Sequence, residues 1–188
     1  MSEVLITATS ASSPPTFIDF EASSLRSASY PIEVAWNAPD GRIEAYLISP
    51  AGIPRWTDWS TEAEKLHGIS RTTLLTEGKP PAWISRRMNH QLRGTIVYSD
   101  DPEYDGTWLA ALFAATFAGG PTFTIQQADD LLMNLIRPRF GSRIQALPHL
   151  EAMKQAARRQ VVGRHRATYD VQYLVTLYTI AERRVVHG

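Results

Sequence analysis

Residues 17–25 read FIDFEASSL, and this short stretch decides the fold that the rest of the chain has to build. Its aromatic and aliphatic members favour a strand in the interior of a sheet, yet Asp19 and Glu21 interrupt them. Because residues i and i+2 of a strand point to the same side, the two carboxylates should lie about 6 to 7 Å apart. Two such acids repel each other, so they need either water at a sheet edge or a cation between them, and a divalent metal ion is the candidate.

Further segments continue the sheet. They are rich in β-branched and aromatic residues and stop at turn-forming residues, which is typical of strands. The predicted strands are 15–22, 31–38, 42–50, 95–100 and 122–125. Pro39-Asp40-Gly41 is a strong hairpin signal, so the first three strands should form an antiparallel meander.

Helical patterns follow the meander and alternate with the later strands. Cap residues, acid-rich first turns and terminal glycines mark their ends. The predicted helices are 60–70, 80–94, 106–117, 126–136, 149–160 and 167–184. The fourth should be stopped by Pro138, because proline breaks a helix interior. An antiparallel meander followed by strand–helix units predicts an α/β fold, a mixed sheet flanked by helices.

Composition narrows the class of protein and of site. The 188 residues fit one domain, and we expect it to span 15–188, behind a flexible leader of residues 1–14 that is rich in Ser, Ala and Thr. No apolar stretch reaches the roughly 20 residues of a membrane span, so we expect no membrane partner and a cytoplasmic location. The chain has no cysteine, which excludes disulfides and leaves carboxylates and imidazoles as metal ligands.

Charge is balanced overall but unevenly distributed. Lys and Arg together number 19, as do Asp and Glu. From Arg137 to Arg166, however, the sequence contains eight basic residues and a single acid, Glu151. A solvated helix face would explain such a run, and so would a nucleic-acid partner.

Three more residues complete a candidate constellation. Asp105 opens an apolar helix, where a helix cap and a metal ligand are both reasonable interpretations. His165 and Asp170 are five residues apart, which separates them by about 140° on a helix. They can converge only if residues 163–166 form a loop and the helix begins near Ala167.

The order of these pieces resembles the DEDDh 3′-5′ exonucleases, a DnaQ-like family of the ribonuclease H-like superfamily. FIDFEASSL is similar to the first motif of that family, YDGTWL to the second and GRHRATYD to the third. Leu66-His67-Gly68-Ile69 is similar to its I-H-G-I segment, and the resemblance spans Thr16 to Ile180. It implies a ribonuclease H-like five-stranded mixed sheet.

The resemblance also implies a reaction. Such enzymes hydrolyse phosphodiester bonds of RNA or single-stranded DNA from a free 3′ end, with two Mg²⁺ or Mn²⁺ ions about 3.5 to 4 Å apart, and release nucleoside 5′-monophosphates. Asp19, Glu21 and Asp170 would hold one ion, Asp19 and, through water, Asp105 the other. His165 would be the general base.

A second set of residues would hold the substrate by the same resemblance: Ala22, Ser23, Leu25, His67, Ile69, Arg164 and Arg166. Leu25 would be an apolar wedge under the terminal base, and the two arginines would contact phosphate. Other interpretations stay open at this stage. Leu25 could belong to the core, His67 could end a helix, and Arg166 could cap one.

The sequence departs from the family where Asp100-Asp101 replaces the usual His-Asn pair. Two acids there would repel a phosphate unless they face away or bind a cation. Two other functions also remain in view: a catalytically inactive nucleic-acid-binding protein of the same fold, and an interaction protein whose acids are surface features. Homodimerisation is plausible because several members of the family are dimers.

Overall fold

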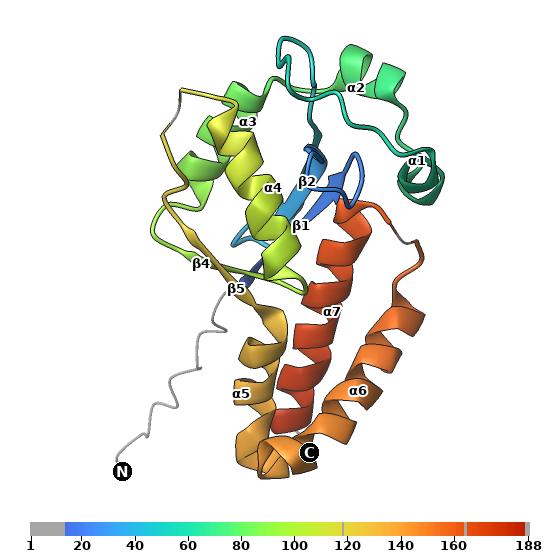
Figure 1. Cartoon of the computed structure of the whole chain (residues 1–188). Coiled ribbons are helices and arrows are strands. Elements are labelled where there is room, and N and C mark those ends of the chain that lie inside the picture. The colour runs from blue at the N-terminus through green and yellow to red at the C-terminus, as the bar shows by residue number, and fades with distance from the viewer. Residues whose placement is uncertain (1–13, 118, 164, 187–188) are drawn as a thin grey trace.

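A five-stranded mixed sheet forms the centre of the computed structural model, which describes residues 14–117, 119–163 and 165–186 (Figure 1). The strands are β1 (Thr16–Ala22), β2 (Pro31–Asn37), β3 (Ile43–Leu47), β4 (Ile96–Ser99) and β5 (Thr124–Gln127). They lie in the order β3-β2-β1-β4-β5. The β1, β2 and β3 pairings are antiparallel, whereas β1–β4 and β4–β5 are parallel.

The helices are α1 (Thr61–His67), α2 (Arg71–Glu77), α3 (Pro81–Gln91), α4 (Pro102–Ala114), α5 (Ala128–Phe140), α6 (Arg143–Gln160) and α7 (Ala167–Val186). Alternation along β1 assigns them to the two faces of the sheet. Ile18 and Phe20 pack in the main core with side chains of α3 and α4. Phe17 packs in a second core with side chains of α7. The mixed sheet flanked by helices that the sequence predicted is confirmed.

Below the sheet, α5, α6 and the second half of α7 form a helical extension (Figure 1). It has an apolar cluster of its own, which joins Leu132 and Ile136 of α5, Leu150 and Met153 of α6, and Leu177 of α7. The helix α7 therefore spans both parts, because its first half covers β1 and β2 while its second half belongs to the extension.

Helix boundaries differ from the predicted ones at two prolines. The prediction that Pro138 stops its helix was wrong, since α5 continues to Phe140, whose ring stacks on His149 of α6 at 4.0 Å between centroids. The helix predicted to begin at 149 begins at Arg143 and contains Pro148. Apolar packing within the helical extension outweighs the backbone hydrogen bond lost at each proline.

Two other segments also differ. The helix predicted to begin at Gly106 begins at Pro102, because the Asp101 side chain caps it by accepting the Tyr104 N–H. Helix α2 was not predicted, although Ser70 caps it through the Thr73 N–H. Residues 1–13 of the predicted leader lie outside the described residues. In the described part of the chain, no helix is both long and apolar enough to cross a membrane.

Candidate active site

Five carboxylates from four segments meet at one end of the central strands. Asp19 and Glu21 come from β1, Asp100 follows β4, Asp105 lies in the first turn of α4, and Asp170 in the first turn of α7. Two groups of three have ligand oxygens within 4.8 Å of one another. One is Asp19, Glu21 and Asp170, and the other is Asp19, Asp100 and Asp105. Asp19 belongs to both groups.

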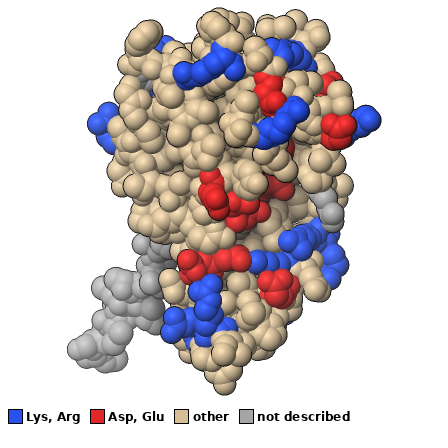
Figure 2. Space-filling model, viewed as in Figure 1, with Lys and Arg blue, Asp and Glu red and all other residues tan. Residues whose placement is uncertain are grey.

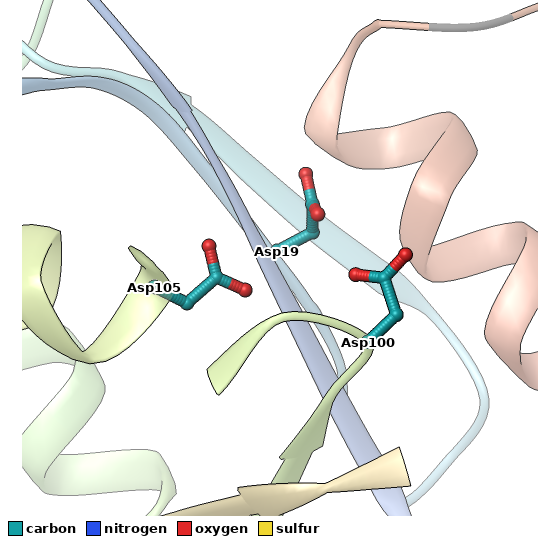
Figure 3. A group of neighbouring side chains, drawn as sticks. All are labelled: Asp19, Asp100 and Asp105. Carbon is teal, nitrogen blue, oxygen red and sulfur yellow. The ribbon is translucent and has the colours of Figure 1, made fainter. Parts of the chain in front are cut away.

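Strand pairing explains why the acids converge. Because β1 and β4 are parallel, with Phe17 opposite Tyr98, their register brings the residue that follows β4 level with Asp19, two residues beyond Phe17 on β1. Asp100 therefore arrives beside Asp19, as Figure 3 shows. Asp105 is 2% exposed and is held in place by Ser99, whose hydroxyl donates to its Oδ2.

On the other side of β1, Glu33 fixes the start of α7. Glu33 lies opposite Glu21 in the β1–β2 register and is 2% exposed. Its carboxylate accepts the Arg166 guanidinium at 2.6 Å and the Ala167 backbone N–H at 3.0 Å. This contact makes Glu33 the cap of α7, and it places Asp170 one turn into the helix, facing Glu21.

The electrostatic surroundings disfavour ionised carboxylates. Burial raises the pKa of Asp19 well above its usual range, and the charges of Asp105 and Asp170 raise it further. Burial and the Asp170 charge raise the pKa of Glu21 to about 8, and burial raises that of Asp170 to about 6. The Asp19 carboxylate accepts no hydrogen bond from any described residue. Oxygen ligands with this much uncompensated charge fit a hard divalent cation such as Mg²⁺ or Mn²⁺.

His165 lies next to this cluster, in the loop before α7. Its side chain is exposed, and its φ of 55° places it in the left-handed region. An open pocket of about 240 Å³ is lined by Asp100, Arg158, Val161, Gly163, His165, Tyr169, Asp170 and Tyr173. The predicted convergence of His165 and Asp170 is therefore confirmed, and the loop with a helix start at Ala167 is the reason.

The predicted substrate-binding residues fall into two groups. Leu25 is 73% exposed, so the interpretation that it belongs to the core was wrong, and its side chain is open to a ligand. Ala22, Ser23 and Ile69 are buried instead. The Ser23 hydroxyl accepts the Tyr30 backbone N–H, and Ile69 packs in the main core. These three can offer a substrate little beyond their backbone.

His67 ends α1 and is only 5% exposed. Its Nδ1 accepts the Ile69 N–H at 3.0 Å, whereas its Nε2 is buried without a partner among the described residues. The guanidinium of Arg166 is held by Glu33, as described above, and its contact with phosphate stays a prediction. Arg164 lies outside the described residues.

Two residues of the site were missed from the sequence. Asp100 is not among the metal ligands expected from the sequence, where cation binding by the Asp100-Asp101 pair is one of two ways to avoid repelling a phosphate; its place directly after a predicted strand is a usable signal. Glu33 carried no signal, because its role depends on the β1–β2 register and on the distant start of α7.

Of the basic residues between 137 and 166, those that the structure describes are only partly available to a ligand. Lys154 pairs with Asp129 at 2.6 Å, and Arg143 with Asp130 at 3.1 Å. Arg158 forms no ion pair with a described residue and lies over the Tyr173 ring, 5.6 Å from its centroid. Figure 2 shows the acidic side chains at the middle of this face, with basic side chains close beside them.

Comparison with known proteins gives a structural likeness alone. No protein-family sequence model matches the chain, and no curated protein matches it in sequence. Exonuclease I from Methylocaldum szegediense has a similar structure, with a TM-score of 0.60 and 19% identity, over 90% of this chain and 40% of that one. E. coli exonuclease I in a zinc-bound complex with single-stranded DNA is similar with a TM-score of 0.57 and 14% identity, over 90% and 41%. E. coli exonuclease I in complex with a dA16 oligonucleotide is similar with a TM-score of 0.58 and 16% identity, over 92% of this chain and 42% of that one.

The chain thus spans about two fifths of the length of these structures. The likeness to the Methylocaldum szegediense enzyme covers nine tenths of this chain. The α/β fold expected from the sequence, a mixed five-stranded sheet flanked by helices, is confirmed, and it is similar to the fold of part of exonuclease I.

Proposed function

We propose that residues 15–188 form a DEDDh 3′-5′ exonuclease domain that hydrolyses phosphodiester bonds in a metal-dependent reaction and releases nucleoside 5′-monophosphates. One observation carries this proposal: two groups of three carboxylates share Asp19, next to His165. Paired cation sites with one bridging carboxylate suit phosphodiester hydrolysis. The oligonucleotide complexes of exonuclease I favour single-stranded DNA over RNA as the substrate.

The carboxylates have the donor chemistry for two Mg²⁺ or Mn²⁺ ions. Asp19, Glu21 and Asp170 would hold one ion, and Asp19 with Asp105 would contribute to the other. When bound, the ions would supply activation of a water molecule and neutralisation of charge on the departing 3′ oxygen. The buried position of Asp19 and Asp105 keeps their oxygens in one arrangement before substrate arrives.

His165 is the general base of the proposed reaction. Its exposed imidazole lies in the same pocket as Asp170, where it can take the proton of the attacking water on a ring nitrogen. Asp170 lies in the first turn of α7 and lines that pocket together with His165. The two residues therefore need the loop that brings them together.

The remaining residues bind the nucleotide. Leu25 offers an exposed apolar side chain against a terminal base, and the backbone of Ala22 and Ser23 follows the metal-binding strand. Since Nδ1 of His67 accepts a hydrogen bond, the neutral ring carries its proton on Nε2, a donor that an oxygen of the terminal nucleotide can use. Arg158 and Arg166 supply positive charge close to the path of the phosphates.

The direct test is digestion of a 5′-labelled single-stranded oligonucleotide with Mn²⁺. A ladder of shortened products that still carry the label, together with resistance of a substrate blocked at its 3′ end, supports the proposal. Asp19→Asn should lose most of the activity and keep the fold, whereas Asp101→Asn should retain activity, because the side chain of Asp101 caps α4 instead of facing the cluster. Matched DNA and RNA substrates decide the preferred sugar.

Binding without cleavage would instead identify a catalytically inactive nucleic-acid-binding protein. If the chain neither cleaves nor retains oligonucleotides, the acidic cluster serves another purpose and the proposal fails. Sedimentation of the same samples tests whether the chain forms a homodimer.

A further inference from the structure

We infer that Asp100 is a direct metal ligand, and that with Asp19 and Asp105 it forms a second cation site that is complete before any substrate binds. This inference rests on the proposed function, because it concerns the second of the two ions. It adds a ligand that the expected set of Asp19, Glu21, Asp105 and Asp170 does not contain.

The three carboxylates reach the site from three directions. Asp19 comes from the middle of the sheet, Asp105 from the first turn of α4, and Asp100 from the turn between β4 and that helix (Figure 3). Their ligand oxygens lie within 4.8 Å of one another, a separation that one ion can bridge. Asp19 and Asp105 are buried whereas Asp100 is exposed, so an ion can reach the site from solvent on the Asp100 side.

Asp19 provides an independent indication of a cation. Its side chain is 9% exposed and accepts no hydrogen bond from a described residue. Figure 3 shows its carboxylate near those of Asp100 and Asp105. A buried carboxylate without a partner is costly, and a bound cation removes that cost. The hydroxyl of Ser99 satisfies one oxygen of Asp105 but does not serve Asp19.

The neighbouring acid, Asp101, already caps helix α4, and this distinguishes it from Asp100. The Asp101 side chain accepts the Tyr104 N–H at the start of α4, and its backbone N–H donates to the Ser99 hydroxyl. The backbone carbonyl of Asp100 accepts the Gln127 side-chain amide at 3.0 Å, which anchors the turn. The Asp100 side chain is thus presented from a fixed backbone, as a metal ligand requires.

Asp100 also changes the charge of the loaded site. Asp19, Glu21, Asp105 and Asp170 balance two divalent ions, and a fifth carboxylate leaves one negative charge in excess. Arg158 lines the same pocket as Asp100 and forms no ion pair with a described residue, so it can offset that charge. With three carboxylates as protein ligands and water in its other positions, the second ion would not depend on a substrate phosphate.

The test is calorimetric titration of the full chain with Mn²⁺, without nucleic acid, for the wild type, Asp100→Asn, Asp100→Ala and the matched control Asp101→Asn. We expect two Mn²⁺ per wild-type chain. Both Asp100 variants should keep one site unchanged and bind the second ion at least tenfold more weakly. Asp101→Asn should bind as the wild type does, since asparagine also caps helices. Circular dichroism of each metal-free variant checks that it is folded.

The outcomes separate this inference from the function beneath it. If Asp100→Asn and Asp100→Ala bind two ions with wild-type affinity, Asp100 is not a ligand and the exonuclease proposal is unaffected. The same holds if the wild type binds a single ion, because the second site then needs substrate. If the wild type binds no Mn²⁺ and cleaves nothing, the proposed function itself is wrong.

Discussion

Glu21→Gln should stabilise the metal-free protein at neutral pH. Burial, the charge of Asp170 and that of Glu33 raise the pKa of Glu21 from 4.5 to about 8. The folded protein therefore retains a proton that the unfolded chain releases above pH 4.5, and stability falls as the pH rises from 4.5 to 8. Glutamine has nearly the same shape and carries no charge, so it removes this pH-dependent loss.

The size of the effect follows from the same shift. Each pH unit between the two pKa values costs about 1.4 kcal/mol, so the wild type loses about 3 kcal/mol between pH 4.5 and pH 7. For a chain of this length, that corresponds to a Tm higher by about 6 to 12 °C in Glu21→Gln. Near pH 4 the two proteins should melt together, because Glu21 is then protonated in both states.

The assay is thermal melting in EDTA between pH 4 and 8, followed by melting with Mn²⁺. Glu44→Gln is the control of opposite sign. Burial alone would raise the pKa of Glu44. Hydrogen bonds from Arg87, Gln91 and Tyr46 nevertheless hold that pKa at about 2. The ionised Glu44 carboxylate stabilises the fold fully above pH 4.5, and this stabilisation is lost as the pH falls toward 2. Glu44→Gln should therefore lower the Tm at pH 7. A Tm difference between Glu21→Gln and wild type that is independent of pH, or negative at pH 7, would refute the reasoning.

Three further predictions concern the residues around the cluster. His165→Ala should leave the free energy of unfolding within about 0.5 kcal/mol of wild type, as expected for an exposed side chain, and reduce kcat by about 10²-fold or more. Unchanged turnover would remove His165 from its role as general base. Leu25→Ala should raise KM for oligonucleotides without lowering the Tm, whereas Ile69→Ala, at a buried position, should cost about 2 to 5 kcal/mol of stability. Arg166→Met should destabilise the fold by about 3 kcal/mol, because it leaves Glu33 charged and buried; urea unfolding at pH 7 measures this, and an unchanged midpoint would contradict it.

Sequence patterns were sufficient where one local rule dominates. The alternation of FIDFEA fixes which residues of β1 face α7, and the Pro39–Gly41 turn fixes the antiparallel pairing of β2 and β3. The same alternation placed Asp19 and Glu21 on one side, where both reach Asp170. Local rules also located the start of α7 and hence the approach of His165 to Asp170.

Tertiary contacts decided the rest. Pro138 and Pro148 lie inside helices because packing in the helical extension compensates for them, and no local pattern reports that packing. Asp100 joins the cluster through the parallel pairing of β4 with β1, two segments about 80 residues apart. Glu33 acts through a partner more than 130 residues away, Arg166.

The course of α7 has a consequence for folding and motion. One end of this helix carries Asp170, while its far half contributes Leu177 and Ala181 to the apolar cluster of the helical extension. Amide hydrogen exchange should therefore report two cooperative units that share the single helix α7. A truncation in the helical extension, for example Leu150→Ala, would weaken the packing of the second half of α7. It should thereby increase the fluctuations of the Asp170 carboxylate, which lies outside the cluster that contains Leu150.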